Sequence, residues 1–262
     1  MPSQERRVAV EAARAAGDLL RGELLNPRRI AFKGSPTNLV TEMDARAEAL
    51  IVERLLAAFP ADAVLAEERG AQAGRSGRCW IIDPLDGTTN YAHGLPLYCV
   101  SIALEAGGRV ELGVAYDPSH GELFVAERGA GAFCNDARLT VSSATTLDQS
   151  LLATGFPYDI RVNPDNNLKE YAAFSRRAQG VRRLGSAVLY LAWVAAGRFD
   201  GYWELRLGAW DVAAAGLMVE EAGGRLTSIT GGPLDLEHPT VVASNGRIHD
   251  EMLAVLKELR GP

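Results

Sequence analysis

The chain has 262 residues, which is long enough for one large α/β domain or for two closely packed halves. Its 47% hydrophobic and 23% charged residues are ordinary for a globular protein, and no apolar run is long enough to predict a membrane span. The net charge of −6 argues against nonspecific nucleic-acid binding, since phosphate backbones attract basic surfaces, but a bound divalent cation could still recruit a phosphorylated substrate.

The start of the chain and its cysteines indicate a reducing compartment. Residues 1–20 carry charges early and lack a long apolar core, so we expect no signal peptide. Cys79, Cys99 and Cys134 are odd in number and widely spaced, without a Cys-x-x-Cys pair. This pattern gives no sign of a thiolate zinc site and favours three small buried hydrophobes. We therefore expect a cytoplasmic protein that does not contact membranes.

In the first half, the hydrophobic pattern predicts two helices followed by strands. Apolar residues on one side predict an amphipathic helix from residue 4 to about 25, and Pro and Gly residues predict a loop over 26–40. A second helix is expected over 41–59, because Thr41 and Asp44 match a capping box with Asp in the Glu position. Strands are expected after it at 63–68, 79–83, 97–106, 109–117 and 121–127.

The second half is predicted to alternate strands and helices more evenly. Strands are expected at 151–156, 181–185, 199–205 and 240–245, and helices at 166–178, 186–197, 209–224 and 247–259. The helix over 186–197 is apolar on nearly every face, which predicts that it is buried. A boundary near residue 145 divides the chain into 1–145 and 146–262. Since no flexible linker marks it, we expect the two halves to share an interface.

Several acidic residues stand where a predicted strand ends or a predicted helix begins. Asp83 and Asp86, in "DPLD", leave a buried strand, and ligands gather outside the carboxyl ends of strands in open α/β sheets. Glu67 ends another strand, and Asp44 and Asp211 lie in the first turns of helices. Taken alone, each acid has a plainer interpretation: a turn before glycine, a favourable charge at a helix N-terminus, or a solvated surface charge.

The pair formed by Asp83 and Asp86 is harder to explain without a cation. Two like charges about 4 Å apart repel by roughly 4 kcal/mol at an effective dielectric constant near 20, and no Lys or Arg lies between Ile81 and Gly94. Either one acid is protonated or a divalent cation lies between them. Hard oxygen ligands favour Mg²⁺ over zinc or copper. Calcium is the competing ion, although the segment lacks the ligand spacing of an EF-hand loop.

The residues that follow this pair suit an anion. Gly87, Thr88 and Thr89 can present backbone N–H groups at the start of a short helix, where phosphate binds, and Thr88 adds a hydroxyl that can orient a water. The same stretch could therefore hold cations on one side and a phosphate on the other. We expect the half 1–145 to bind metal and phosphate, and the half 146–262 to complete the active site.

The chain resembles the inositol monophosphatase family, part of the Mg²⁺-dependent, lithium-sensitive phosphatase superfamily. "DPLDGTTN" is similar to the first family signature and "WDVAAAGLMVEEAGG" to the second, while "KGSPTNLVTEMD", "LAEERG", "YDPSHGELFVAERGAGAF" and "GFPYD" match further segments in the expected order. The match covers nearly the whole chain. It implies an alternating α/β/α/β/α sandwich, a homodimer, and hydrolysis of phosphate monoesters by direct attack of a metal-activated water.

The resemblance also implies roles for the acids. The implied metal ligands are Glu67, Asp83, the backbone carbonyl of Leu85, Asp86 and Asp211. Thr88, with Glu67 behind it, would align and deprotonate the attacking water. Asp44 would bind an outer magnesium through water or hold Thr88 in place. Metal ions of this kind neutralise charge and hold the attacking and leaving oxygens, which is what phosphoryl transfer requires.

The substrate contacts implied by the resemblance lie in both halves. The phosphate would bind the N–H groups of Gly87 and Thr88, Glu204 would bind substrate hydroxyls, and the same pocket would be lined by Gly185, Ser186 and Ala187. One departure is visible, since Asn38 stands where many relatives carry Asp, which puts the outer metal network in question. The histidines at 93, 120, 238 and 249 show no paired metal spacing, so we interpret them as structural or exposed.

Alternative functions remain open. Inositol-1-monophosphatase activity is the first hypothesis, with fructose-1,6-bisphosphate, histidinol phosphate or another sugar or polyol phosphate as other substrates. "DGTTN" favours these over the nucleotide-bisphosphate branch, where the resemblance leads us to expect Lys after "DGT". A non-enzymatic regulatory role in binding protein or RNA machinery is the second hypothesis, although the acidic charge argues against direct RNA contact. A structural calcium site is the third.

Overall fold

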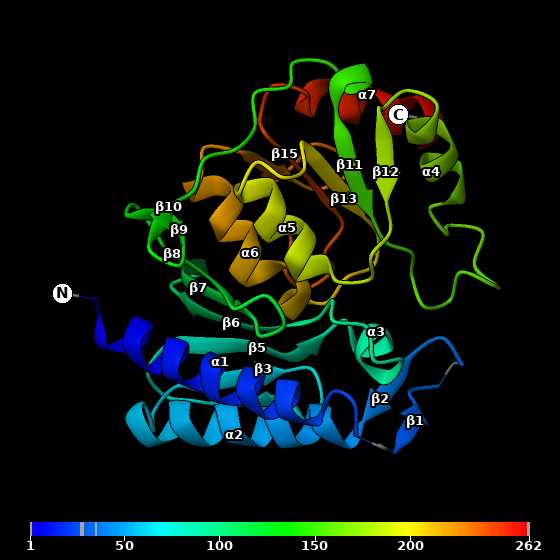
Figure 1. Cartoon of the computed structure of the whole chain (residues 1–262). Helices are drawn as coiled ribbons and strands as arrows, with labels where there is room; N and C mark the ends of the chain where they lie inside the picture. The colour runs from blue at the N-terminus through cyan, green and yellow to red at the C-terminus, as the bar shows by residue number, and fades with distance from the viewer. Residues whose placement is uncertain (1, 27–28, 35, 261–262) are drawn as a thin grey trace.

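The computed structural model describes residues 2–26, 29–34 and 36–260, and its helices and sheets stack in alternating layers (Figure 1). One helix pair covers a face of a large sheet, a second pair separates that sheet from a small one, and a third pair covers the outer face of the small sheet. In that order, the pairs are α1 (Gln4–Glu23) with α2 (Glu42–Ala58), α5 (Ala187–Ala195) with α6 (Ala209–Glu221), and α4 (Leu168–Ser175) with α7 (His249–Arg260). The α/β/α/β/α arrangement implied by the resemblance is confirmed.

The large sheet lies in the first half of the chain. Within the described residues its strand order is β10-β9-β8-β7-β6-β5-β3-β4, and neighbouring strands are antiparallel except for β3 and β5, which run parallel. Its strands are β3 (Ala63–Ala66), β4 (Gly70–Gln72), β5 (Arg78–Asp86), β6 (Cys99–Ala106), β7 (Arg109–Asp117), β8 (Glu122–Glu127), β9 (Gly131–Cys134) and β10 (Ala137–Arg138).

The central strand β5 carries the acidic motif. The strand predicted over 79–83 continues to Asp86, but its register against β6 shifts between Asp83 and Asp86. Pro84 lies within this irregular part, and a proline cannot donate a ladder hydrogen bond. The short helix α3 (Thr88–Ala92) follows at once, with Gly87 between strand and helix. The motif is therefore the turn from a buried strand into a helix.

The small sheet lies in the second half of the chain. Within the described residues its strand order is β12-β11-β13-β15-β14, with β11 parallel to both β12 and β13 and the remaining pairs antiparallel. Its strands are β11 (Leu151–Thr154), β12 (Gly180–Arg182), β13 (Gly201–Glu204), β14 (Arg225–Thr227) and β15 (Val241–Ser244), and the 3₁₀ turn η1 (Leu147–Gln149) precedes β11. The two sheets thus fall on either side of residue 145, and the proposed division of the chain at that point stays a prediction.

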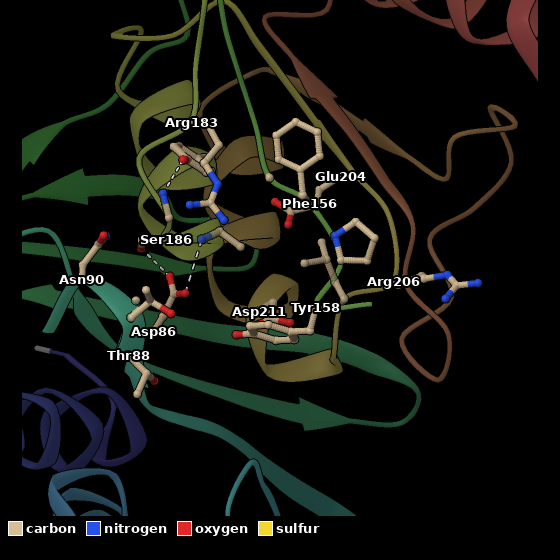
Figure 2. Close-up of a pocket in the computed structure, with 18 residues that line it drawn as sticks. Asp86, Thr88, Asn90, Phe156, Tyr158, Arg183, Ser186, Glu204, Arg206 and Asp211 are labelled. Atoms are coloured by element: carbon tan, nitrogen blue, oxygen red, sulfur yellow. Dashed lines mark hydrogen bonds between the residues drawn. The ribbon is translucent and has the colours of Figure 1, made fainter. Parts of the chain in front are cut away.

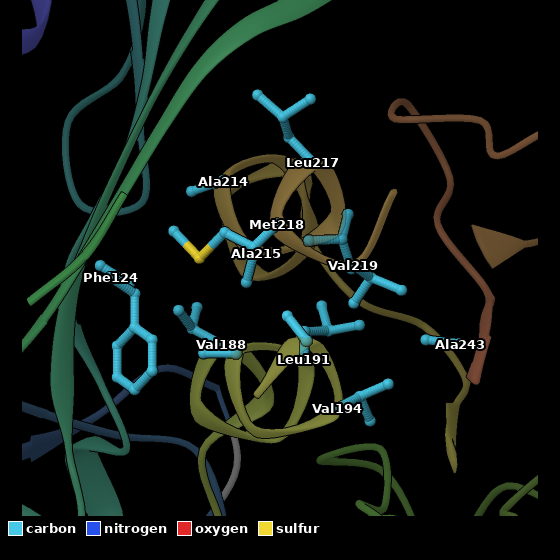
Figure 3. Packing of buried hydrophobic residues seen from close by; sticks show 14 of the residues in the cluster. Phe124, Val188, Leu191, Val194, Ala214, Ala215, Leu217, Met218, Val219 and Ala243 are labelled. Atoms are coloured by element: carbon cyan, nitrogen blue, oxygen red, sulfur yellow. The ribbon is translucent and has the colours of Figure 1, made fainter. Parts of the chain in front are cut away.

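The middle helix layer joins the two sheets through apolar packing. Figure 3 shows α5 and α6 side by side, with Val188 and Met218 near Phe124 of the large sheet and Leu191 between the helices. On the other side Ala243 of the small sheet lies nearby. Because α5 faces apolar neighbours all round, the continuous apolar pattern over 186–197 reflects burial, as predicted.

Most predicted elements are confirmed, with ends shifted by at most three residues, and the misses are short strands. The loop predicted over 26–40 was wrong in its described part, because β1 (Ile30–Phe32) and β2 (Leu39–Thr41) form an antiparallel hairpin. Residues 27, 28 and 35 of that loop lie outside the described residues. The strands that the sequence did not predict elsewhere are β4, β9, β10 and β14. Among the described helices, none is both long and apolar enough to cross a bilayer.

Candidate active site

A polar cavity opens where β5, α3, the N-terminus of α6 and two loops of the second half meet. Figure 2 shows Thr88 and Asp86 on one side of it, with Ser186 next to Asp86, Glu204 across from Thr88, and Tyr158 beside Asp211. A neighbouring part of the cavity shares Asp86, Thr88 and Asp211 and extends to other predicted site residues and their neighbours: Lys33, Asn38, Glu67, Asp83 and Leu85. Both halves of the chain therefore build one cavity.

Asp83, Asp86 and Asp211 form an acidic cluster in this cavity. Each offers a carboxylate oxygen, and these oxygens all lie within 4.8 Å of one another. Burial raises the pKa of all three carboxyl groups, and the negative charges of neighbouring acids raise the pKa of Asp83 and Asp211 further. The cluster is therefore electrostatically unfavourable when all three groups are ionised and no cation is bound.

Backbone donors hold two of these acids. The Asp83 Oδ1 atom accepts a hydrogen bond from the Leu85 N–H at 2.9 Å, and the Asp211 Oδ2 atom accepts one from the Gly208 N–H at 2.6 Å. The second oxygen of each carboxylate receives no hydrogen bond from the described residues. These contacts fix the side chains while leaving one oxygen of each available to a ligand.

Asp86 is bound by the N-terminus of α5. Its carboxylate accepts hydrogen bonds from the Val188 N–H at 2.8 Å, from the Ala187 N–H at 3.3 Å, and from the Ser186 hydroxyl. A carboxylate is favoured there by the unpaired N–H groups and the helix dipole. The resemblance implied that Ser186 and Ala187 line the substrate pocket, and they do line the cavity. They also tie a buried acid of the first half to a helix of the second.

Lys33 supplies a positive charge that the sequence analysis did not anticipate. Its ammonium lies 3.0 Å from Glu67 Oε1 and also pairs with Glu68. Burial raises the pKa of Glu67 to about 7, although Lys33 lowers it. Glu67 is not among the three acids whose oxygens lie within 4.8 Å of one another. A lysine outside the segment 81–94 therefore offsets part of the negative charge, which the search for nearby cations in the sequence missed.

Thr88 is held between two acceptors. Its hydroxyl lies 3.0 Å from Asp44 Oδ1 and 3.0 Å from the Leu85 carbonyl oxygen. Asp44 also accepts hydrogen bonds from the backbone and hydroxyl of Thr41, the first of them completing the predicted capping box at the start of α2. The N-terminus of α2 thereby positions Thr88, so the contact between Asp44 and Thr88 that the resemblance implied is present.

Gly87 shapes the turn that presents α3. Its φ of 94° is in the left-handed region, and a Cβ atom there would lie 2.8 Å from the Leu97 carbonyl oxygen. Both the conformation and the space demand glycine. Asn90, one turn later, donates to the carbonyl oxygens of Leu97 at 2.8 Å and Leu184 at 2.6 Å, which fixes α3 against the second half.

Glu204 forms the floor of the cavity on the side of the small sheet. The Tyr202 hydroxyl donates to its Oε2 at 2.7 Å, and burial raises the pKa of the Glu204 carboxyl to about 7. A Cβ atom on Gly155 would lie 2.1 Å from Glu204 Oε1, so only glycine leaves room for this carboxylate. The sequence analysis named Glu204 but neither of these neighbours, although Gly155 opens the "GFPYD" segment.

The remaining sequence predictions concern cysteines and histidines. Cys99 is buried, with its sulfur 3.8 Å from Asp86 Oδ2, whereas Cys79 and Cys134 are only half-buried. His249 is buried, and His93, His120 and His238 are exposed, outside the acidic cluster. The acids, not the histidines, therefore form the group that could hold a metal ion among the described residues.

A hard divalent cation fits this group. The donors are carboxylate oxygens, which suit Mg²⁺, Mn²⁺ or Ca²⁺ better than softer metals. The fit also has an electrostatic basis, because a cation would relieve the repulsion that raises the pKa of Asp83 and Asp211. The described residues place Lys33 against Glu67 and Glu68, not against Asp83, Asp86 or Asp211.

Comparison with known proteins shows which family the chain belongs to. The model of the inositol monophosphatase family matches residues 1–260. The chain belongs to the inositol monophosphatase family. An inositol-1-monophosphatase of Mesorhizobium japonicum is 45% identical over 255 residues, covering 96% of this chain and 95% of that protein. The Nus factor SuhB of Escherichia coli is 41% identical over 254 residues, covering 96% of this chain and 95% of that protein.

Solved structures of family members share the fold. The inositol monophosphatase from Anabaena (Nostoc) sp. PCC 7120 has a TM-score of 0.88 and 43% sequence identity, covering 96% of this chain and 94% of the other. The extragenic suppressor protein suhB from Bartonella henselae has a TM-score of 0.92 and 41% identity, covering 99% and 100%. As a member of this metal-dependent phosphatase family, the chain is a phosphoric monoester hydrolase, with a phosphorylated polyol as the class of substrate.

Proposed function

We propose that this inositol monophosphatase family member is a Mg²⁺-dependent phosphatase that acts on inositol monophosphate or a closely similar polyol phosphate. The observation that carries the proposal is the convergence of Asp83, Asp86 and Asp211 within 4.8 Å, in a cavity that also contains Thr88 and Glu204. The similarity to proteins named inositol-1-monophosphatase supports the substrate.

The proposed metal ligands come from three elements. They are Glu67, Asp83, the backbone carbonyl of Leu85, Asp86 and Asp211, all of which line the cavity. Bound Mg²⁺ would neutralise the charge on the phosphate oxygens and make a nearby water more acidic. The chain's own contribution is to hold these oxygens together against their mutual repulsion, through backbone hydrogen bonds to Asp83, Asp86 and Asp211. Asp44 remains a proposed contact to an outer magnesium through water.

Thr88 and Glu67 are the proposed groups that position and deprotonate the attacking water. Both neighbours of the Thr88 hydroxyl, Asp44 and the Leu85 carbonyl, can accept its proton, so the lone pairs of that hydroxyl remain to accept a hydrogen bond from water. Glu67 lines the same part of the cavity, and its carboxylate is the nearby group proposed to accept the proton of that water.

The proposed substrate contacts lie on both sides of the cavity. The N–H groups of Gly87 and Thr88, at the turn into α3, would bind the phosphate, and Gly185, Ser186 and Ala187 would line the adjacent wall. Glu204 would accept hydrogen bonds from polyol hydroxyls, since carboxylate oxygens are acceptors when ionised.

Phosphate release from a panel of substrates tests this proposal. The panel contains inositol 1-phosphate, fructose 1,6-bisphosphate, histidinol phosphate and a nucleotide phosphate, each assayed with Mg²⁺, with Ca²⁺ and with chelator alone. We expect release only with Mg²⁺ and the highest kcat/KM for inositol 1-phosphate. Equal activity with Ca²⁺, or activity in chelator, would contradict the metal assignment. A clear preference for histidinol or nucleotide phosphate would contradict the substrate.

A regulatory binding role is the second candidate function, because relatives about 41% identical are named Nus factor SuhB. The Asp83→Asn variant separates the two roles. A catalytic role requires Asp83, whereas a purely binding role would survive its replacement. Asp18→Asn, on the exposed face of α1, is the matched control and should leave both roles intact.

Three further features remain proposals: a homodimer, a cytoplasmic location and inhibition by Li⁺. The dimer is checked by sedimentation at micromolar concentration, where a particle close to the 28.1 kDa of one chain would contradict it. Inhibition is checked by adding LiCl to the inositol 1-phosphate assay at fixed Mg²⁺, with NaCl at the same concentration as control. Fractionation of the source cells checks the location.

A further inference from the structure

The two parts of the cavity meet at a junction that several side chains share. One part contains the acidic cluster and the other contains Glu204, so a bound polyol phosphate would have its phosphate beside the cluster and its hydroxyls beside Glu204. The ester oxygen, which joins the phosphate to the polyol, would then lie at the junction. Among the described residues, the polar side chains that line both parts are Asp86, Thr88, Tyr158, Arg206 and Asp211.

Most of these side chains cannot donate a hydrogen bond to an oxygen at the junction. The carboxylates of Asp86 and Asp211 are acceptors when ionised. The Thr88 hydroxyl has one proton, which already faces two acceptors, Asp44 Oδ1 and the Leu85 carbonyl oxygen, each at 3.0 Å. These three side chains therefore suit the metal and the attacking water rather than the ester oxygen.

Arg206 and Tyr158 are the two remaining side chains. Arg206 forms an ion pair with Asp159 at 2.5 Å, and Figure 2 shows it extending away from the acidic cluster. Tyr158 lies beside Asp211 in the same view, on the cavity side of the loop that follows β11. It is 54% exposed, so a ligand can reach it. Tyr158 is therefore the side-chain donor that the geometry places at the junction.

The hydroxyl end of Tyr158 lies close to the acidic cluster. Burial, and then the negative charges of Glu67 and Asp211, raise the pKa of this hydroxyl. A tyrosine has an ordinary pKa of about 10, so the hydroxyl keeps its proton at neutral pH even where a bound cation cancels those charges. It can therefore act as a neutral donor beside the phosphate.

The backbone around Tyr158 is fixed from both halves of the chain. The Thr37 hydroxyl, from the first half, donates a hydrogen bond to the Tyr158 carbonyl oxygen. The Ile160 N–H donates to the Pro157 carbonyl oxygen at 3.0 Å, which closes a turn around Tyr158. A donor that begins from a fixed backbone needs little reorganisation when charge develops on its acceptor.

We propose that Tyr158 is a further catalytic residue, whose hydroxyl donates a hydrogen bond to the ester oxygen of the substrate. The inference rests on the proposed function, from which it takes the position of the phosphate. As the attacking water gives a proton to Glu67 and bonds to phosphorus, the P–O bond to the polyol breaks and its electron pair moves to the ester oxygen. The hydrogen bond from Tyr158 stabilises that charge, and the alkoxide then takes a proton from solvent.

The leaving group of the substrate provides the test. An alkoxide is a poor leaving group that needs such a donor, whereas p-nitrophenolate delocalises its own negative charge. Tyr158→Phe keeps the ring and removes the hydroxyl. With Mg²⁺, we expect its kcat on inositol 1-phosphate to fall between about tenfold and a hundredfold, the range for one hydrogen bond to a charged group. On p-nitrophenyl phosphate kcat should fall less than about threefold, and KM should change less than about threefold on both substrates.

Tyr171→Phe is the matched control. Tyr171 packs on Phe156, with ring centroids 5.6 Å apart, but it lines neither part of the cavity, so the variant should leave both activities intact. Three outcomes would overturn the proposal: equal losses of kcat on both esters in Tyr158→Phe, a rise in KM with kcat unchanged, or the same selective loss in Tyr171→Phe.

Binding measurements exclude an indirect effect through the metal or the phosphate. Titration calorimetry of Tyr158→Phe with Mg²⁺, and then with inorganic phosphate at saturating Mg²⁺, should give affinities within about twofold of the unmodified protein. A larger loss of Mg²⁺ affinity would assign the effect to the acidic cluster. A larger loss of phosphate affinity would make Tyr158 a phosphate ligand. Either result contradicts the proposal.

The choice of substrates separates this inference from the proposed function. If inositol 1-phosphate is a poor substrate of the unmodified protein, the proposed substrate is wrong. The comparison is then made between p-nitrophenyl phosphate and the alkyl phosphate of the panel that is hydrolysed fastest. A selective loss on that alkyl phosphate in Tyr158→Phe would still support the role of Tyr158, and an equal loss on both would overturn it.

Discussion

The two sheets contribute to the active site in different ways. The large sheet supplies one continuous stretch, Asp83 to Thr88, at the end of its strand β5, and places Glu67 after β3. The second half supplies single residues from separate elements, with Asp211 in the first turn of α6 and Glu204 at the end of β13. Under the proposed function, the first half would carry most of the metal and phosphate chemistry, and the second half would carry most of the choice of substrate.

The interface between the halves is the exception to this division. Asp86 belongs to the large sheet, yet its carboxylate accepts hydrogen bonds from Ser186, Ala187 and Val188 of the second half. Asp211 brings a carboxylate from the second half to the cluster. The acidic cluster therefore depends on the packing of α5 and α6 against the large sheet. The division of roles between the halves is incomplete, and the effects of single mutations on activity can measure it.

The largest expected effect is on Asp86. Replacing it by Asn should reduce Mg²⁺-dependent phosphate release by a factor on the order of 10³ or more on every substrate, because a charged ligand is lost from the cluster. The fold should remain, since Asn keeps one oxygen for the α5 N-terminus. The check is kcat/KM together with circular dichroism. A variant that kept most of its activity would remove Asp86 from the metal site.

Replacing Glu204 by Ala should distinguish the proposed role of the second half, substrate choice, from that of the first half. We expect KM for inositol 1-phosphate to rise about tenfold, since a buried acceptor for a hydroxyl is lost, with a smaller change on an aryl phosphate that has no such hydroxyls. The Tyr202→Phe variant is the matched control, because it removes the hydrogen bond to Glu204 but keeps the carboxylate. Equal losses on both substrates would mean that Glu204 does not contact the polyol.

The acidic cluster should also govern the stability of the metal-free protein. Because the folded-state pKa of Asp83 is raised by burial and by neighbouring acids, the folded state binds its proton more tightly than the unfolded state. Stability in chelator should therefore be greatest at low pH, as far as this group is concerned, and fall as the pH rises above about 4. Asp83→Asn should remove this loss.

Thermal unfolding in chelator at pH 8 measures the effect. We expect Asp83→Asn to raise Tm by roughly 2–4 °C, the shift produced by about 1 kcal/mol in a chain of this size. At saturating Mg²⁺ the unmodified protein should have the higher Tm, since it gains binding free energy that the variant lacks. A variant less stable than the unmodified protein in chelator would show that Asp83 is not electrostatically strained.

The contribution of His249 to stability should depend on pH in the opposite direction. It is buried between Thr227 and Ser244, with ring nitrogens 2.9 Å from each hydroxyl, and burial lowers its pKa to about 4. The unfolded state therefore binds the proton more readily, so this residue makes stability fall as pH drops from about 6.5 to about 4. This lowering of the His249 pKa corresponds to a loss of unfolding free energy on the order of 3 kcal/mol at most.

Denaturant unfolding of His249→Gln across that range is the measurement. The difference in unfolding free energy between the unmodified protein and the variant should shrink as the pH falls, because glutamine does not titrate. A difference that stays constant between pH 7 and pH 4 would contradict the buried neutral histidine. Together, the Asp83→Asn and His249→Gln measurements would place the base-sensitive group in the active site and the acid-sensitive group at the start of α7, against the small sheet.

The sequence predicted those parts of the site that lie close together along the chain. Asp83, Asp86 and Thr88 form one short segment, and Thr41 with Asp44 form one helix turn, so local spacing was enough to identify them. The long helices followed from amphipathic or fully apolar segments, whereas the layered arrangement was implied by the family resemblance. Short strands such as β9 and β14 were missed because a few residues give too little periodicity to recognise.

The rest of the site depends on contacts between distant segments. Nothing local to Lys33 indicates that it pairs with Glu67, and nothing local to Gly155 indicates that its missing side chain makes room for Glu204. Arg183 lies in a segment predicted as a strand, but β12 ends at Arg182 and Arg183 begins the turn that enters the cavity. These contacts form only when the two halves pack together, and local sequence patterns do not predict that packing.

The central claim is that Asp83, Asp86 and Asp211 bind a divalent cation. Anomalous diffraction from crystals grown with Mn²⁺ in place of Mg²⁺ tests it most directly, because the ion can be located without assuming its ligands. The claim predicts an anomalous peak about 2.2 Å from an oxygen of each of these three carboxylates. Side chains turned apart into solvent, with no peak between them at saturating Mn²⁺, would contradict it.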